Sequence, residues 1–276
     1  MAWRIKVTHT TAFQYESEVS ASFNEARMTP LSNQSQFLVQ HDLKVKPASS
    51  VFTYQDYFGT TVKSFDVQSP HMALKIVSES VVDTSEFQPP AISISWEELK
   101  KERITEDFAE YLDFSSLVNP LTKDFDLSQQ ESPIAAVFHL NNIMRDYITY
   151  TPGATNVYSP ASEAWEKKAG VCQDFSHATL SILREVGIPA RYISGYLYTG
   201  LGEIGEEVIG ESHSWVEAWV GYWMPIDPTN GRPVVEDHIV VAKGRDYHDV
   251  SPLKGIFSGG RSRKIEVTVS LIRLDR

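Results

Sequence analysis

Residues 170–189 read GVCQDFSHATLSILREVGIP and contain the only cysteine of the chain, Cys172. Apolar residues recur there at positions 175, 178, 182 and 186, in steps of three and four, which predicts a helix with one buried face. Gly187 and the following Ile188-Pro189 predict its end. Cys172 therefore stands at the helix N-terminus, where unpaired backbone N–H groups and the helix dipole favour a thiolate over a thiol.

A lone cysteine is often nothing more than a small buried hydrophobic residue. Two features of the surrounding sequence favour a reactive thiol instead. Gly170 permits a close approach to the helix, and Gln173 and Asp174 make the first turn polar rather than core-like. We therefore treat Cys172 as a candidate nucleophile.

Two later segments supply possible partners. ESHSWVEAWV at 211–220 predicts a strand that starts near His213, and WMPIDPTNG at 223–231 predicts a second strand that ends at Asp227. The tight connection at 221–222 would bring His213 beside Asp227. Alone, His213 could be a surface histidine and Asp227 a turn residue, with Glu217 or Glu211 as alternative acceptors. Together, Cys, His and Asp fit the nucleophile, base and orienting group of covalent acyl transfer.

The rest of the chain divides into a β-rich and a mixed region. From 3 to about 83 apolar residues have period two, which predicts short antiparallel strands, and Pro89-Pro90 within a polar stretch predicts a boundary. We expect a β-rich N-terminal domain at 1–90 and a second domain at 91–276. Within the second domain, helices are expected at 95–103, 132–148, 159–170 and 172–186. Strands are expected at 192–198, 213–220, 223–226 and, with apolar residues at 265, 267, 269 and 271, at the C-terminus.

Composition excludes several classes of protein. With 42% hydrophobic and 22% charged residues, the chain is neither disordered nor fibrous. Twenty-five basic against 36 acidic residues give a net charge of −11, so neither nucleic acid nor a membrane surface is an expected partner. One cysteine excludes an intramolecular disulfide and a cysteine-rich zinc site. The opening MAWRIKVTHTTAF lacks the apolar run of a signal peptide, so we expect a cytoplasmic protein with a free thiol.

The three blocks around Cys172, His213 and Asp227, in this order and spacing, resemble the transglutaminase-like superfamily, and specifically the bacterial transglutaminase-like cysteine proteases. NEARMTP at 24–30, DYFGT at 56–60 and DHIVVAKGRDYHDVSPLKG at 237–255 extend the resemblance over nearly the whole chain. It implies an α+β fold in which the helix carrying the nucleophile packs on an antiparallel sheet, as in papain. It also implies that Cys172 is the nucleophile, His213 the general base and later acid, and Asp227 the group that orients the imidazole.

This chemistry leaves several functions open. Hydrolysis of peptide or isopeptide bonds is the leading hypothesis, transfer of the acyl group to an amine is the second, and a catalytically silent peptide-binding scaffold is the third. A peptide or protein substrate is expected, with no cofactor, and the oligomeric state stays open. Gln173 is a candidate second donor to the oxyanion, although a solvated side chain is the commoner outcome. His177 lies about 140° around the helix from Cys172 and is not an expected partner.

A metal site is the remaining alternative. His238, His248 and Asp249 could be imagined as ligands, but no two adjacent histidines have a helical i, i+4 spacing and a Cys-His-Asp triad needs no metal. We therefore expect no metal.

Overall fold

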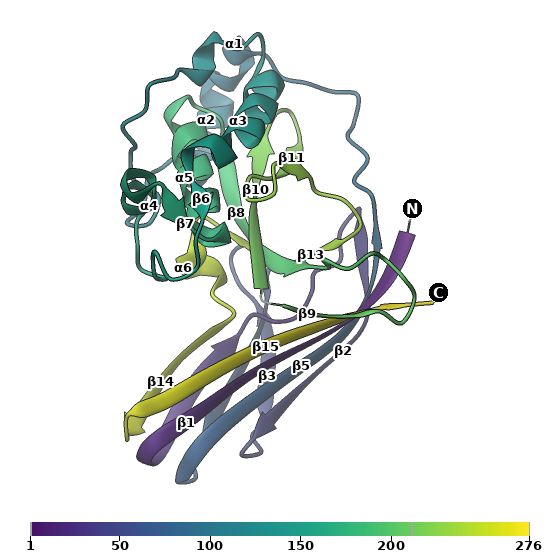
Figure 1. Cartoon of the computed structure of the whole chain (residues 1–276), viewed down its shortest axis with the longest axis vertical. Coiled ribbons are helices and arrows are strands. Elements are labelled where there is room, and N and C mark those ends of the chain that lie inside the picture. Colours follow the sequence, from purple (N-terminus) through teal and green to yellow (C-terminus); the bar gives the residue numbers. More distant parts are fainter. Residues whose placement is uncertain (1, 211, 276) are drawn as a thin grey trace.

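The computed structural model describes residues 2–210 and 212–275, which form two main antiparallel sheets with the helices gathered around one of them (Figure 1). The larger sheet has eight strands, five from the N-terminal region and three from later in the chain. They are β1 (Ala2–Ala26), β2 (Gln36–Lys46), β3 (Val51–Gln55), β4 (Thr61–Val67), β5 (His71–Ser85), β9 (Glu207–Gly210), β14 (Leu253–Gly259) and β15 (Ser262–Leu274). Its central order is β2-β5-β1-β15-β9, with β4 and β14 also pairing with β1, and β3 with β4.

The predicted period-two pattern of the N-terminal region is confirmed. Along β4 and β5 the inward positions Val62, Phe65, Leu74 and Ile76 are all buried. The C-terminal strand follows the prediction only in its second half, because Val269 and Leu271 are buried whereas residues 265 and 267 are more than half exposed. The first half of β15 lies in the part of the sheet that extends away from the helices (Figure 1).

The second sheet has five strands in the order β12-β11-β10-β8-β13, each antiparallel to its neighbour. The strands are β8 (Ala190–Leu197), β10 (Ser212–Trp219), β11 (Trp223–Asp227), β12 (Arg232–Pro233) and β13 (His238–Gly244). A short parallel pair, β6 (Thr149–Tyr150) and β7 (Ala169–Gly170), lies just before the helix that begins at Cys172.

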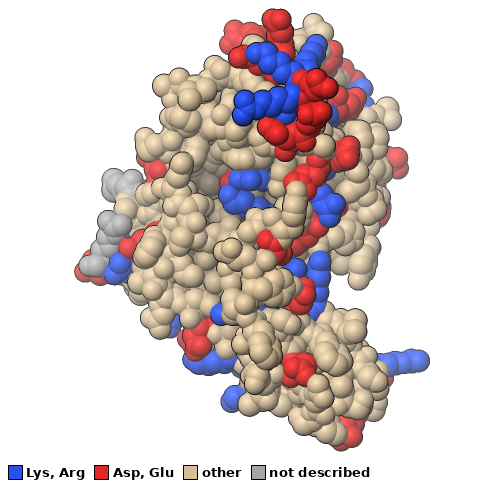
Figure 2. Space-filling model, turned by 180° about the vertical axis from the view of Figure 1, so that it is seen from behind, with Lys and Arg blue, Asp and Glu red and all other residues tan. Residues whose placement is uncertain are grey.

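The described residues form six α-helices. They are α1 (Trp96–Leu99), α2 (Glu102–Asp107), α3 (Pro133–Tyr147), α4 (Ala161–Lys167), α5 (Cys172–Glu185) and α6 (Tyr247–Val250), with 3₁₀ turns at Ala109–Tyr111 and Leu127–Gln129. Of these six, α3, α5 and α6 contact the five-stranded sheet. The helix expected at 95–103 is divided, because Lys101 has an extended backbone between α1 and α2. Charged side chains of both signs crowd the end of the molecule where these two helices lie (Figure 2). No helix among the described residues has the length and apolar content needed to cross a membrane.

Helix α5 packs against β10 and β8, so the expected α+β arrangement is confirmed. Its apolar residues Phe175, Leu180, Ile182 and Leu183 are all at most 1% exposed. Burying four such side chains contributes on the order of 1.5–3 kcal/mol each. This packing fixes the helix N-terminus, and with it Cys172, beside strand β10.

The N-terminal sheet and the helical region share one continuous core. Ile5 and Val7 of β1 belong to the same buried cluster as Phe175 of α5. Between the two sheets, the Gln36 side chain donates to the carbonyl of Val240 at 2.8 Å and accepts from its N–H at 2.8 Å. The division into domains at residue 90 stays a prediction.

Candidate active site

The N-terminus of α5 is built around a buried carboxylate. Asp174 is 1% exposed, and its Oδ2 accepts hydrogen bonds from the Val171 N–H at 2.7 Å and the Thr155 hydroxyl at 2.6 Å. A Cβ on Gly170 would lie only 2.5 Å from the same oxygen, so the close approach needs glycine. Burial raises the pKa of Asp174 above its ordinary value. The polar first turn predicted from the sequence is therefore polar but buried, and Cys172 is its half-buried first residue.

A hairpin delivers the other two candidate residues. Strands β10 and β11 pair from Val216 opposite Ile226 to Trp219 opposite Trp223, and Gly221 takes a positive φ of 99° in the connection. That backbone conformation favours glycine. Beyond the paired segment, His213 Nε2 lies 3.0 Å from Asp227 Oδ2. The predicted juxtaposition of His213 and Asp227 is therefore present.

The Asp227 carboxylate is completely enclosed and receives hydrogen bonds on both oxygens. Oδ2 lies 3.0 Å from His213 Nε2 and 3.2 Å from His238 Nε2, and it accepts from Asn230 Nδ2 at 2.6 Å. Oδ1 accepts from the backbone N–H groups of Thr229 and Asn230 at 3.1 and 3.2 Å. Burial opposes ionisation, but the bonds from the two histidines outweigh it and hold the pKa of Asp227 well below its ordinary value.

Cys172 and His213 interact directly. Since Nε2 of His213 faces Asp227, the Nδ1 side of the ring is left for the sulfur. Burial opposes the charged imidazole, but the hydrogen bonds with Asp227 and Cys172 raise the pKa of His213 to about 9. Burial also raises the pKa of the Cys172 thiol, yet the hydrogen bond and charge of His213, with a smaller contribution from Ser214, lower it overall. Both shifts favour the thiolate–imidazolium form of the pair.

The thiol opens into a cleft of about 440 Å³. Its walls come from the end of α3, from β6, from α5, from β8 to β10 and from the turn after β11. The lining residues are Arg145, Ile148, Thr149, Tyr150, Cys172, Phe175, Leu197, Thr199, Gly210, Ser212, His213, Thr229 and Asn230. Apart from Cys172 and His213, the side chain among them that is charged at neutral pH is Arg145. A cation in this place does not attract a protonated amine.

Other residues considered from the sequence have structural partners. Gln173 is 8% exposed rather than solvated, and its amide donates to the Val157 carbonyl at 3.3 Å. His177 is fully buried, and its Nε2 accepts from the backbone N–H of Tyr247 at 3.2 Å. Glu217, an alternative acceptor, is bound instead by Arg191 Nε at 2.7 Å. Glu211, the other alternative, lies outside the described residues.

His238 is the residue near the site whose position the sequence pattern did not indicate. Within the described part of the chain, His213, Asp227 and His238 have possible ligand atoms within 4.8 Å of one another, a spacing that a metal ion could use. Both imidazoles, however, already face the same Asp227 oxygen, which accounts for the cluster as a hydrogen-bonded group. His248 and Asp249, considered with His238 as possible ligands, are not part of the cluster; Asp249 pairs with Arg245.

Comparison with known proteins agrees with this architecture. Residues 5–83 match the bacterial transglutaminase-like N-terminal region, and residues 122–228 match the transglutaminase-like superfamily. A solved structure from Cytophaga hutchinsonii, described as a "Putative Cysteine Protease", has the same fold. Its TM-score is 0.77 at 20% identity, over 100% of this chain and 92% of that one.

Two mycobacterial relatives match this chain over nearly its whole length. An uncharacterised protein of Mycobacterium leprae is 40% identical over 99% of both chains. An uncharacterised protein of Mycobacterium tuberculosis is 31% identical over 98% of this chain and 92% of its own. A protein-glutamine gamma-glutamyltransferase of Pseudomonas aeruginosa is 29% identical over 107 residues, 37% of this chain and 16% of its own. With both regions matched and full-length relatives above 30% identity, the chain belongs to the transglutaminase-like superfamily and carries the bacterial N-terminal region of that family.

Proposed function

We propose that the protein is a cysteine hydrolase that cleaves amide bonds in a peptide or protein substrate through Cys172, His213 and Asp227. One observation carries this proposal. The half-buried thiol of Cys172, at a helix N-terminus, interacts with the imidazole of His213, whose Nε2 lies 3.0 Å from the buried carboxylate of Asp227. Cys172 and His213 both line the cleft. That arrangement has the three roles that covalent acyl transfer needs.

In the first half-reaction the Cys172 sulfur attacks the carbonyl carbon of the scissile amide and forms a C–S bond. The oxyanion is stabilised by backbone N–H groups at the start of α5, with that of Cys172 as the first donor. The imidazolium of His213 gives its proton to the leaving nitrogen, the C–N bond breaks, and a thioester remains.

In the second half-reaction a water molecule attacks the thioester carbon while His213 takes one of its protons. The C–S bond breaks, the carboxylic acid leaves and the thiolate is restored. Asp227 keeps its charge throughout and holds the ring by Nε2, so that Nδ1 faces the sulfur.

Hydrolysis is favoured over transfer to an amine by the charges of the cleft. Among its described lining residues, Arg145 is the charged side chain besides the reacting pair, and it repels a protonated lysine. An amine acceptor also gains little from the overall charge of −11, because charges more than about 8 Å away are screened at physiological ionic strength. We further propose a cytoplasmic location, where a reducing environment keeps Cys172 as a free thiol.

The test is acylation by p-nitrophenyl acetate, followed by mass spectrometry of the intact chain with and without millimolar cadaverine. We expect one acetyl group on Cys172, lost at the same rate with or without the amine. Saturable acceleration with an amide product would replace the hydrolase by a transferase. A chain that is never acylated on Cys172 would support the third hypothesis, a catalytically silent peptide-binding scaffold.

A further inference from the structure

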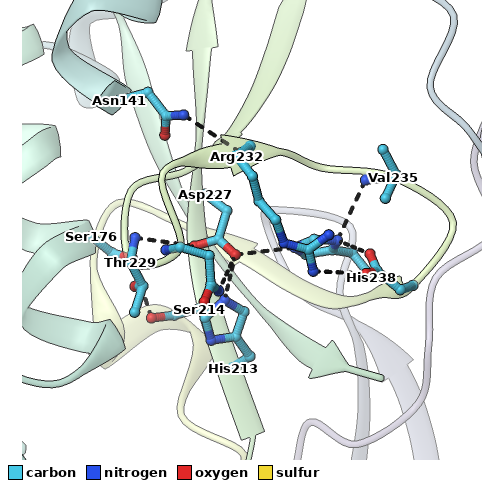
Figure 3. Close-up of polar contacts among 11 residues, drawn as sticks. Asn141, Ser176, His213, Ser214, Asp227, Thr229, Arg232, Val235 and His238 are labelled. Atoms are coloured by element: carbon cyan, nitrogen blue, oxygen red, sulfur yellow. Dashed lines mark hydrogen bonds and ion pairs between the residues drawn. The ribbon is translucent and has the colours of Figure 1, made fainter. Parts of the chain in front are cut away.

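Two imidazoles approach one carboxylate oxygen from different strands. His213 from β10 and His238 from the start of β13 lie 3.0 and 3.2 Å from Asp227 Oδ2. Figure 3 shows both rings directed at the Asp227 carboxylate. The triad logic of the reaction uses only the first of these contacts. The second needs its own explanation, because His238 has no exposed side-chain surface and does not reach the substrate cleft.

The far side of the His238 ring faces a second carboxylate. His238 Nδ1 is 2.6 Å from Asp237 Oδ1, and Asp237 Oδ2 accepts from Arg232 Nη2 at 2.7 Å. The Val235 N–H also points at Nδ1, but at 3.4 Å it is the weaker contact. An ionised carboxylate only accepts hydrogen bonds, so each of the two carboxylates offers an acceptor to one nitrogen of the ring.

Hydrogen-bonded groups follow one another from Cys172 through His213, Asp227, His238 and Asp237 to the Arg232 guanidinium at the surface. Although burial opposes it, the bond from His238 lowers the pKa of Asp237.

The hydrogen bond from His238 weakens the hydrogen bond that Asp227 accepts from His213. A carboxylate oxygen that already accepts a hydrogen bond from His238 has less electron density to offer His213. His213 must release its proton to the leaving nitrogen during the reaction. If Asp227 held that proton too strongly, the imidazolium would be a poor general acid.

We propose that His238 is a positioning residue that holds the Asp227 carboxylate in place and weakens its hold on the proton of His213. The inference rests on the proposed function, in which His213 transfers that proton. Other aromatic and charged groups lie around His238. Trp215 packs edge-on against it with ring centroids 5.2 Å apart, and Arg191, Glu217 and Lys243 line the cavity of about 460 Å³ that His238 borders on that side.

The test follows the ring of His213 by NMR as a function of pH, with EDTA present so that no metal occupies the cluster. His238→Gln is compared with the unsubstituted chain, and His139→Gln, on the exposed surface of α3, serves as the matched control. We expect the His213 midpoint to rise by about half a pH unit or more in His238→Gln, about a threefold change in the imidazolium-to-imidazole ratio at fixed pH. A merely structural role would lower the melting temperature and leave this midpoint unchanged. An unchanged or lower midpoint in the folded variant would overturn the proposal.

A second measurement needs no substitution and remains available if His238→Gln does not fold. The ¹⁵N shifts of the His238 ring in the unsubstituted chain report which nitrogens carry protons. We expect a protonated Nε2, whereas an unprotonated Nε2 cannot donate to Asp227 and would overturn the proposal. Neither readout requires turnover. A failure here is therefore distinct from a failure of the proposed hydrolase, which would appear as a Cys172 that is never acylated.

Discussion

The Asp174 carboxylate occupies the space that a side chain on Gly170 would need, since a Cβ there would lie 2.5 Å from Asp174 Oδ2. That oxygen also accepts the Val171 N–H at 2.7 Å, so the same atom holds the chain just before Cys172. The start of α5 is thus fixed by a contact between a glycine and a buried acid. The position of Cys172 depends on this contact.

Gly170→Ala is expected to destabilise the fold by about 1–3 kcal/mol, because the added methyl forces the Asp174 side chain away from its donors. It should also slow alkylation of Cys172 by iodoacetamide at pH 7. Gly210→Ala is the matched control for stability, since a Cβ there would meet nothing within 4 Å. Equal melting temperatures for the two variants would show that the Gly170 contact does not constrain the helix.

Cys172→Ala is expected to fold normally and to lose all acetylation by p-nitrophenyl acetate. The substitution removes one sulfur atom from a helix that is held by Phe175, Ile182 and other core residues, so its free energy of unfolding should change by less than about 1 kcal/mol. Acetylation is measured by mass spectrometry of the intact protein. A variant that kept more than a few per cent of the acetylation rate would remove Cys172 from the mechanism.

Part of the candidate site could be predicted from the sequence. Local signals predicted that His213 and Asp227 lie side by side, because the hairpin that joins them is encoded in consecutive residues, whereas the role of Cys172 with them was implied by the resemblance to the transglutaminase-like superfamily. The position of His238 could not be predicted, since β13 pairs with β8 and reaches Asp227 only through the tertiary fold. From the sequence alone, His238 was considered as a possible metal ligand together with His248 and Asp249, which are near it along the chain.

Burial in the fold also could not be predicted from local sequence patterns alone. Alternating apolar residues predicted the C-terminal strand, but no local signal shows that residues 265 and 267 lie beyond the shared core. Likewise, Gln173 and Asp174 predicted a first turn unlike a core, but both side chains are buried through the packing of α4, α5 and the 151–160 loop. Local patterns thus predicted elements and their order, whereas burial was set by contacts between distant segments.

Glu217→Gln is expected to destabilise the protein by about 3–5 kcal/mol, because it leaves two nearly buried cations without their carboxylate. Glu217 Oε2 is 2.5 Å from Arg191 Nη2 and 3.5 Å from Lys243 Nζ, and its pKa is lowered by these cations despite burial. Chemical denaturation measures the loss. Glu79→Gln, at the surface pair with Lys44, is the control that should leave stability nearly unchanged. A similar small effect at Glu217 would mean that water reaches the cluster freely.

Asp227→Asn should reduce turnover by up to about four orders of magnitude, as expected when the acceptor that orients a catalytic imidazole is neutralised. An amide also offers an N–H₂ group to a position where His213, His238 and Asn230 all present donors. Some loss of stability, about 1–3 kcal/mol, is therefore expected as well. The acetylation rate at saturating p-nitrophenyl acetate is the measurement. Unchanged acetylation in a folded variant would return Asp227 to the role of a turn residue.

The stability contributed by His213 should depend on pH in a defined direction. Its pKa is about 9 in the folded protein, against about 6.5 in an unfolded chain, so the folded state favours the charged ring. This contribution is fully present below about pH 6.5 and is lost as the pH rises through about 9. Cys172 titrates together with His213, and the Cys172→Ala background removes that coupling while keeping the bond to Asp227.

In that background, His213→Gln should lower the free energy of unfolding most at pH 6 and progressively less towards pH 9, as measured by urea denaturation at each pH. His139→Gln in the same background should give a difference that is small at every pH, because this side chain is exposed. If the His213→Gln difference instead grew as the pH rose, the ring would be neutral in the folded protein at low pH. Asp227 would then not hold an imidazolium, and His213 could not start the reaction as the general acid.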